Sequence, residues 1–305
     1  MKRTLTYSIR DVIPYINWIY FFHAWGFPPR YAAVSRIRAC QTLKEDWIKE
    51  FSVSEQARAT EAIHLFKDAE KMLTLLDENY MTHARVGVFD AYSEGDDIIF
   101  IDTDSANKRV LRLPMLRQQN TTEPFLCLAD FVHPYSDKGL DKAGIFAAAS
   151  DDEIEHLYEC STASDDYKHL LAQTLSDRLA EATAERMHEE VRKSIWGYAP
   201  DEHLSIDDMF IEKYSGIRPA VGYPSLPDQS INFELARFLN FEPVGIRLTE
   251  NGAMRPHASV SGLLLSHHSA HYFSVGKIGE DQLKNYAERR KIDINTMRKF
   301  LAANL

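Results

Sequence analysis

The chain has 305 residues, of which 45% are hydrophobic and 26% are charged, as in a soluble globular protein that buries its own core. Its formal net charge of −10 argues against a nucleic-acid-binding protein, which usually carries a basic stripe. The cysteines, Cys40, Cys127 and Cys160, are too far apart for a C-x-x-C site or a disulfide framework, so we expect a cytoplasmic protein.

The apolar run within Ile16–Trp25 resembles neither a signal peptide nor a membrane span, because it is short and is interrupted by Asn17 and His23. We therefore predict a buried amphipathic helix in this segment and no membrane association.

The rest of the first third predicts a long helix followed by antiparallel strands. The helix opens at Ser54 and runs to Asn79, with apolar residues at three- and four-residue spacing. A Ser-Glu-Gly turn around Gly95 joins the first two strands into a hairpin. The strands expected in this region are Ala84–Phe89, Asp97–Asp102 and Val110–Leu113.

The strongest helical pattern runs from about Asp165 to Trp196, where an apolar stripe is flanked by charged residues, and Pro200 stops any continuation. Ser205 and Asp208 then form a capping-box pattern that predicts a short helix through Tyr214.

The last third predicts a helix near Ser230–Leu239 and terminal helices, the last of them capped by Asp293. The strands expected here are Gly245–Leu248, Val260–Leu265 and His271–Val275. Strands that pair through hairpins, with helices grouped between them, indicate an α+β fold with an antiparallel twisted sheet. Since no linker-like shift in composition is visible, residues 1–305 are expected to form one elaborated domain that includes the helical part of about residues 1–80.

The stretch Arg218-Pro-Ala-Val-Gly-Tyr223-Pro224 combines an anion-binding side chain with a stiff backbone. The planar guanidinium of Arg218 can pair with a carboxylate through two parallel hydrogen bonds. Two prolines restrict the segment, while Gly222 lets the main chain approach a ligand or take a positive φ. Tyr223 adds an aromatic face with a polar tip. The loop suits a small zwitterion such as an amino-acid derivative, although it also fits a surface turn that Pro and Gly merely shape.

Several familiar sites lack their motifs, since the sequence holds no G-x-G-x-x-G turn, Walker loop or G-x-S-x-G elbow. His267-His268-x-x-His271 is expected to lie in a hairpin turn and not to bind a metal, because a metal site needs three or four convergent ligands. Glu181, Glu185 and Glu189 lie one helical turn apart and are expected to form a solvated face, with a carboxylate facing a cationic ligand as the alternative.

Six further strings accompany the Arg218–Pro224 loop in a fixed order. They are Leu116-Arg-Gln-Gln119, Cys127-Leu-Ala-Asp-Phe-Val132, Leu179-Ala-Glu-Ala182, Val191-Arg-Lys193, Trp196-Gly-Tyr-Ala-Pro200 and Ala258-Ser-Val-Ser-Gly262. Together they resemble the C-terminal activation, or reactivation, domain of cobalamin-dependent methionine synthase, the module that binds S-adenosylmethionine. The resemblance runs from about Asp11 to the C-terminus, and seven strings in the right order make it specific.

This resemblance implies a reactivation chemistry. In the family, the cobalamin cofactor occasionally oxidises to inactive cob(II)alamin. An electron, typically from a flavodoxin-type donor, is then coupled to methyl transfer from S-adenosylmethionine, which regenerates methylcobalamin. The reduction is uphill, and the irreversible loss of a methyl group from a sulfonium pulls it forward.

The resemblance also implies a set of ligand-binding residues. Arg218, Gly222 and Tyr223 fall on the family motif R-x-x-x-G-Y, and Ala220 supplies a main-chain contact. Arg218 is implied to take the methionyl carboxylate of the ligand.

Two acidic residues, Glu181 and Glu212, match family positions near the ligand, where a carboxylate favours the sulfonium or ammonium group.

The family usually shows Tyr-Ile-Asp-Trp near its N-terminus, with the aspartate touching the ligand, whereas this chain has Tyr15-Ile-Asn17-Trp18. Asn17 accepts a hydrogen bond but brings no charge, so we expect the attraction for the ammonium group to be weaker by about 1–2 kcal/mol. Leu263-Leu264-Leu265 stand where the family tends to carry aromatic residues, so the surface presented to the corrin is expected to differ.

The sequence contains neither a homocysteine or folate module nor the D-x-H-x-x-G corrinoid-binding motif. We therefore expect a free-standing activation subunit with its own Met1, which docks on a separate cobalamin-carrying methionine synthase polypeptide and is not active alone. A fragment of a longer synthase is the alternative organisation. Two other functions stay open, namely reactivation of another corrinoid methyltransferase, and a non-catalytic S-adenosylmethionine-binding regulatory protein.

Overall fold

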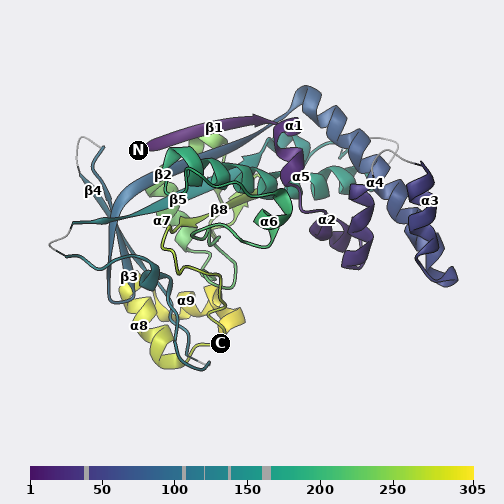
Figure 1. Cartoon of the computed structure of the whole chain (residues 1–305). Coiled ribbons are helices and arrows are strands. Elements are labelled where there is room, and N and C mark those ends of the chain that lie inside the picture. The colour runs from purple at the N-terminus through teal and green to yellow at the C-terminus, as the bar shows by residue number, and fades with distance from the viewer. Residues whose placement is uncertain (38–40, 105–107, 120, 137–138, 160–165) are drawn as a thin grey trace.

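The computed structural model describes residues 1–37, 41–104, 108–119, 121–136, 139–159 and 166–305, so Cys40, Cys160 and Asp165 lie outside the described residues. Its main sheet is antiparallel with strand order β4-β3-β2-β5-β8, and β1 pairs with the first half of β2 (Figure 1). The strands are β1 (Lys2–Ser8), β2 (Met81–Glu94), β3 (Asp97–Asp102), β4 (Arg109–Pro114), β5 (Asp141–Ser150) and β8 (Ser259–Leu264), with β6 (Arg247–Leu248) and β7 (Met254–Arg255) forming a small separate ladder.

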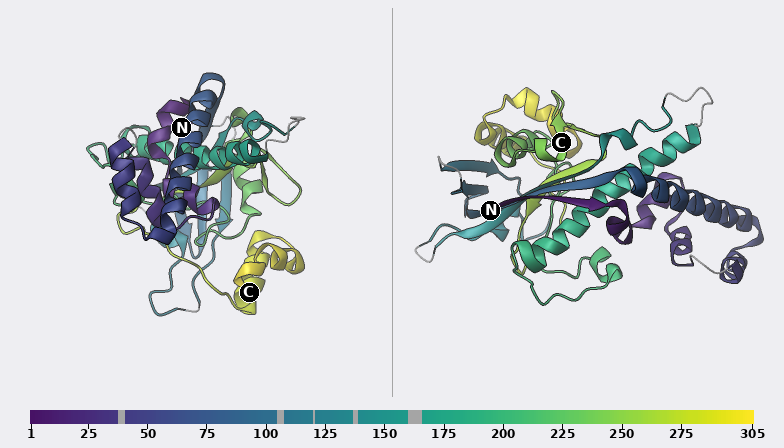
Figure 2. Two further views of the ribbon diagram at one scale, coloured as in Figure 1. Left: turned by 90° about the vertical axis from the view of Figure 1, so that its right-hand side faces the viewer. Right: turned by 90° about the horizontal axis from the view of Figure 1, so that it is seen from above.

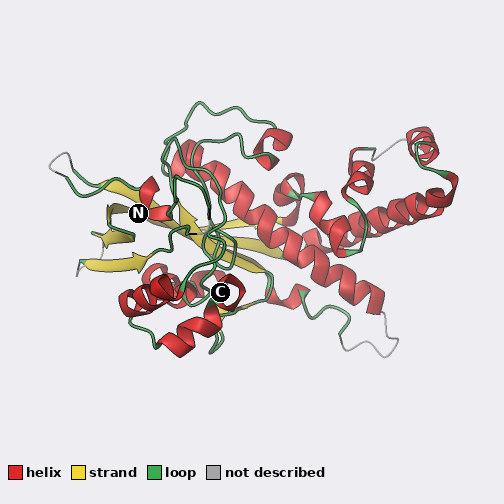
Figure 3. Ribbon diagram, turned by 90° about the horizontal axis from the view of Figure 1, so that it is seen from below, coloured by secondary structure: helices red, strands yellow, loops and turns green. Residues whose placement is uncertain are grey.

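Helices cover both faces of this sheet because successive strand residues point to opposite sides. Phe146 and Ala148 of β5 pack on the side of α5 (Asp166–Glu190) and the N-terminal helices, whereas Ile145 and Ala147 face α7 (Ile231–Leu239). Figure 2 shows the sheet from two further sides, and Figure 3 shows the long helix α5 crossing the strands.

The remaining helices come from three parts of the chain. The N-terminal part forms α1 (Ile9–Val12), α2 (Trp18–Ala24), α3 (Gln41–Lys49) and α4 (Val53–Asn79), which lie together on the opposite side of Figure 1 from the N-terminus itself. Later in the chain follow the short α6 (Ile206–Phe210) and the C-terminal pair α8 (Glu280–Arg290) and α9 (Ile294–Phe300). No helix in the described part of the chain has the length and apolarity needed to traverse a lipid bilayer.

The predicted α+β class with an antiparallel sheet is confirmed, as are the hairpin around Gly95 and the caps at Ser205 and Asp293. The strand predicted at His271–Val275 is wrong, because this segment has no regular structure. The helix predicted through Tyr214 already ends at Phe210.

The sequence patterns predict neither β1 nor the interior strand β5. Eight consecutive residues of β5 are buried, so its sequence shows no alternation of polar and apolar residues. The segment Ala147-Ala-Ala-Ser150 also lacks the β-branched and aromatic residues that favour strands. Burial between two helical layers, and not local preference, therefore defines this strand.

Candidate functional site

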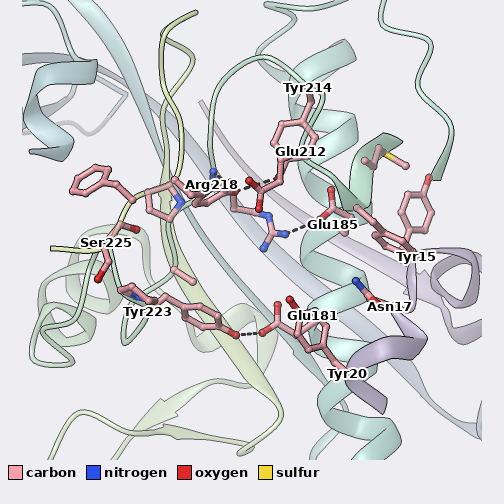
Figure 4. Close-up of a pocket in the computed structure, with 18 of the residues that line it drawn as sticks. Tyr15, Asn17, Tyr20, Glu181, Glu185, Glu212, Tyr214, Arg218, Tyr223 and Ser225 are labelled. Atoms are coloured by element: carbon pink, nitrogen blue, oxygen red, sulfur yellow. Dashed lines mark hydrogen bonds and ion pairs between the residues drawn. The ribbon is translucent and has the colours of Figure 1, made fainter. Parts of the chain in front are cut away.

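A cavity of about 620 Å³ opens between α5, the start of α2 and the loop that precedes α7 (Figure 4). This volume is in the range of pockets that bind small molecules, which is about 300–1,000 Å³. Its lining includes Tyr15, Asn17, Tyr20, Arg178, Glu181, Glu185, Glu212, Tyr214, Arg218, Ala220, Tyr223 and Tyr272. Six of the seven residues predicted as a site from the sequence thus line one cavity, and Gly222 does not.

The loop from Ile217 to Val221 forms one wall because it runs along the outer edge of β8, where it extends the sheet as an irregular strand. Backbone hydrogen bonds of 2.8 to 3.0 Å hold it there, joining Ile217 to Leu265, Pro219 to Leu263 and Val221 to Ser261. The wall that carries Arg218 and Ala220 is therefore fixed to the rigid part of the fold.

Two glycines permit this arrangement in different ways. A Cβ atom on Gly262 would lie 2.2 Å from the carbonyl oxygen of Pro219, so only glycine allows the loop to approach β8 this closely. Gly222 has a φ of +89°, and its amide donates a 2.8 Å hydrogen bond to the carbonyl oxygen of Leu226. Gly222 therefore shapes the turn that presents Tyr223.

Arg218 is largely buried in the cavity wall, with 10% of its side chain exposed. Its Nη2 lies 2.8 Å from Oε2 of Glu185, and its guanidinium lies 5.7 Å from the ring centroid of Phe146. The Arg218 amide donates to the Tyr272 hydroxyl at 2.9 Å. Burial alone would lower the pKa of Arg218, but the charge of Glu185, with Tyr272 and Tyr214, outweighs it and raises that pKa. The side chain is a fixed cation.

The glutamates of α5 do not form the solvated face expected from their spacing. Glu185 is only 9% exposed and pairs with Arg218, so the prediction is wrong for this residue. One turn later, Glu189 accepts a hydrogen bond of 2.5 Å from the Tyr15 hydroxyl. One turn earlier, Glu181 accepts one of 2.5 Å from the Tyr223 hydroxyl, across the cavity (Figure 4).

Glu212 reaches the cavity from the segment after α6, where its φ of +59° marks a turn. Partial burial and, after it, the neighbouring charge of Glu185 raise the pKa of the Glu212 carboxyl group. This carboxylate therefore takes up a proton more readily than an ordinary glutamate.

Asn17 lies at the cavity and is also the N-cap of α2, because its Oδ1 accepts a 3.1 Å hydrogen bond from the amide of Ile19. The side chain is therefore fixed by the helix that follows it, as an aspartate at this position would be.

Sequence reasoning did not find Tyr272 as part of the cavity, nor its neighbours Phe273 and Ser274. They belong to the irregular segment predicted as a strand, and no local motif marks them. Leu263–Leu265 are fully buried, so the surface change expected from them is wrong.

The histidine cluster lies in the segment that follows β8. His267 stacks on His268 with ring centroids 4.5 Å apart, and Phe131 packs against both His267 and His271. The predicted hairpin around these residues is wrong, because the second strand is missing. Within the described ranges, no group of three or more His, Cys, Asp or Glu residues is arranged to hold a metal ion.

A sheet that carries an arginine loop on its edge, opposite an acidic helix, defines an α+β domain built to bind a small charged molecule. Residues 8–291 match the family described as vitamin B12 dependent methionine synthase, activation domain, and the chain belongs to this family. The fold is similar to a solved structure described as the crystal structure of the MetH reactivation domain bound to AdoHcy, with 36% sequence identity and a TM-score of 0.86. The match covers 100% of this chain and 90% of that chain.

Proposed function

We propose that the chain binds S-adenosylmethionine in this cavity and supports reductive methylation of cob(II)alamin on a separate cobalamin-carrying methionine synthase polypeptide. The observation that carries the proposal is Arg218, a buried cation in the wall of a cavity large enough for the ligand. A guanidinium so placed suits the carboxylate at the methionyl end. The similar domain bound to AdoHcy, the demethylated product, supports the same choice of ligand.

The charges around the cavity favour the methyl donor over its product. Glu181, Glu185 and Glu212 carry three negative charges when ionised, and Arg178 and Arg218 carry two positive charges, which leaves one negative charge in excess. S-adenosylmethionine has a sulfonium, an ammonium and a carboxylate group, and so one net positive charge, whereas S-adenosylhomocysteine is neutral overall. Opposite charge in a partly buried site strengthens binding.

In the proposed reaction, the residues of this chain bind and orient the methyl donor. Arg218 holds the carboxylate, Ala220 offers main-chain contact, and the ring of Tyr223 lies over the ligand. Cobalamin is the methyl acceptor: an electron reduces cob(II)alamin, the methyl carbon passes from sulfur to cobalt, and S-adenosylhomocysteine leaves with the electron pair of the broken carbon–sulfur bond.

We further propose that cobalamin and the electron come from other proteins, the electron from a flavodoxin-like donor, in the cytoplasm. In support, these 305 residues contain the cavity for the methyl donor but not the D-x-H-x-x-G motif with which a corrinoid would be held. Reactivation of methionine synthase and reactivation of another corrinoid methyltransferase differ in the protein that this chain binds. A pull-down with each corrinoid protein, in the presence of S-adenosylmethionine, distinguishes the two functions.

Calorimetric titration of the purified chain with S-adenosylmethionine tests the ligand. We expect Arg218→Ala to weaken binding by about tenfold or more, as for loss of a charge-assisted hydrogen bond of about 1.5–3 kcal/mol. Arg10→Ala is the control, because the Arg10 side chain is 83% exposed and pairs with Asp77 away from the cavity. Equal affinities of the two variants would contradict the assignment.

A single-turnover assay tests the chemistry. It combines the chain with a cob(II)alamin-loaded corrinoid protein, a reductant and S-adenosylmethionine labelled in the methyl group. Transfer of label to cobalamin is expected only when all components are present. Ligand binding without any transfer to any corrinoid protein would favour a regulatory protein instead.

A further inference from the structure

Two buried polar atoms in the cavity wall have no hydrogen-bond partner among the residues that the structure describes. They are Oε1 of Glu185 and Nε of Arg218. Both belong to side chains that line the cavity and are joined to each other by the 2.8 Å contact between Oε2 and Nη2. Buried donors and acceptors are normally paired, because an unpaired one carries the cost of its lost hydration. The hydrogen bonding of this ion pair is therefore incomplete, and both of its side chains line the cavity that a ligand would enter.

The unpaired atoms are of opposite kinds. A carboxylate oxygen only accepts hydrogen bonds, and a guanidinium nitrogen only donates them. An α-amino acid presents the matching groups on one carbon, an ammonium with three donors and a carboxylate with two acceptors. An acceptor and a donor held side by side by an ion pair thus fit the amino-acid end of one ligand.

The other polar groups of the cavity are less suited to the ammonium. Glu181 shares Oε1 with the Tyr223 hydroxyl and is more exposed than Glu185, so solvent can hydrate its other oxygen. Oδ1 of Asn17 accepts a hydrogen bond from a backbone amide and carries no charge. Glu212 has a raised pKa, caused first by burial and then by the charge of Glu185, so its carboxylate gives up its charge more readily than an ordinary one. Glu185 is paired with Arg218 and still has an oxygen to spare.

We infer that Glu185 is a further ligand-binding residue, which orients Arg218 through one carboxylate oxygen and binds the ligand's ammonium group through the other. The pair selects ligands whose α-amino-acid end is intact. This inference rests on the proposed function, since it names how the same cavity distinguishes among S-adenosyl compounds.

The test compares two neutral-sulfur ligands by calorimetry, S-adenosylhomocysteine and its deaminated analogue, 5′-S-(3-carboxypropyl)-5′-thioadenosine. For the unmodified chain we expect the deaminated analogue to bind about tenfold or more weakly. In Glu185→Gln this ratio should fall below about threefold, because the neutral amide no longer attracts the ammonium group. The ratio between two ligands isolates recognition of one group, whereas a general disturbance of the cavity would weaken both ligands alike.

Glu190→Gln is the matched control, because Glu190 lies on the same helix but pairs with Arg186, outside the cavity. It should keep the full ratio. Glu185→Asp serves as a second variant that retains a charged partner for Arg218 while withdrawing the carboxylate by one methylene, and it too should lower the ratio. Circular dichroism checks that each variant is folded.

Full discrimination by a folded Glu185→Gln or Glu185→Asp variant would overturn the inference and leave the proposed function standing. Equal affinities of the unmodified chain for the two ligands would also overturn the inference about Glu185 without contradicting the proposed function. If the unmodified chain bound neither these ligands nor S-adenosylmethionine, the proposed function itself would fail.

Discussion

Asn17 serves the fold and the cavity at once, because its amide oxygen caps α2 while the side chain lines the site. Asn17→Asp keeps an acceptor for the cap and adds a negative charge. We expect S-adenosylmethionine to bind more tightly by about 1–2 kcal/mol, or roughly 5- to 30-fold. Titration of the unmodified chain and the variant measures this, with Asn17→Ser as a control that keeps the cap without the charge. Equal affinities of the unmodified chain and Asn17→Asp would contradict the prediction that a negative charge at position 17 strengthens binding.

Glu212 predicts a pH dependence of binding. Partial burial and the charge of Glu185 raise its pKa above the ordinary carboxyl value of 4.5. A cationic ligand prefers the ionised carboxylate, so binding and proton release are linked. Affinity for S-adenosylmethionine should therefore rise as the pH increases through this raised pKa and fall as the pH drops below it.

Titrations over a pH series check the effect, and Glu212→Gln should flatten the profile in that window. S-adenosylhomocysteine, which lacks the sulfonium charge, should show the shallower slope. A profile unchanged by Glu212→Gln would assign the pH dependence to another group.

At the scale of the element, the junction between β8 and the binding loop depends on Gly262. In Gly262→Ala the new Cβ would collide with the carbonyl oxygen of Pro219, and backbone must shift to admit it. We expect a loss of about 1–3 kcal/mol in the free energy of unfolding, as for other overpacked sites, together with weaker ligand binding. Urea denaturation and calorimetry measure the two effects. Ser259→Ala, at the start of the same strand, should change both far less.

The sequence predicts those elements whose residues alternate or repeat with a clear period. The hairpin around Gly95 and the long helix that became α5 are of this kind. The interior strand β5 cannot be predicted in this way, because burial on both faces removes the alternation of polar and apolar residues from its sequence. The strand expected at His271–Val275 does not form, since the open edge of β8 is already taken by the binding loop.

The residues of the candidate site likewise fall into those that a sequence motif marks and those that only the fold brings to the cavity. The binding loop is contiguous in sequence, so its motif marks Arg218, Ala220 and Tyr223 together. Tyr272 joins the cavity only through the path of the chain after β8. Glu185 has the spacing of a surface residue, and only the packing of α5 against the loop shows that it is buried beside Arg218.

At the scale of the whole molecule, a buried ion pair joins the segment that continues α5 to the long connection that precedes α6. Arg192 is fully buried, contacts both carboxylate oxygens of Glu202 at 2.7 to 2.9 Å, and lies 4.4 Å from the ring centroid of Tyr214. The ion pair therefore fixes the connection between α5 and α6, which leads on to Glu212 at the cavity.

Glu202→Ala would leave the Arg192 charge buried and unpaired, at a cost of about 3–5 kcal/mol in the free energy of unfolding. Glu280→Ala removes the partner of Arg298 at the surface, where 68% of the Glu280 side chain is exposed, and should cost under about 1 kcal/mol. Chemical denaturation compares the two. A small effect of Glu202→Ala would mean that this connection contributes little to stability.

The position of the binding loop also affects which backbone groups at the edge of the sheet are open to other molecules. An uncovered edge strand offers free amide and carbonyl groups to strands of other molecules, and is a common starting point for aggregation. In this chain the loop bonds to the amide of Leu263 and to both the amide and the carbonyl of Leu265. The segment proposed to bind the methyl donor thus also covers the edge of the sheet. A ligand that stabilises the loop in this position would therefore protect the protein against self-association.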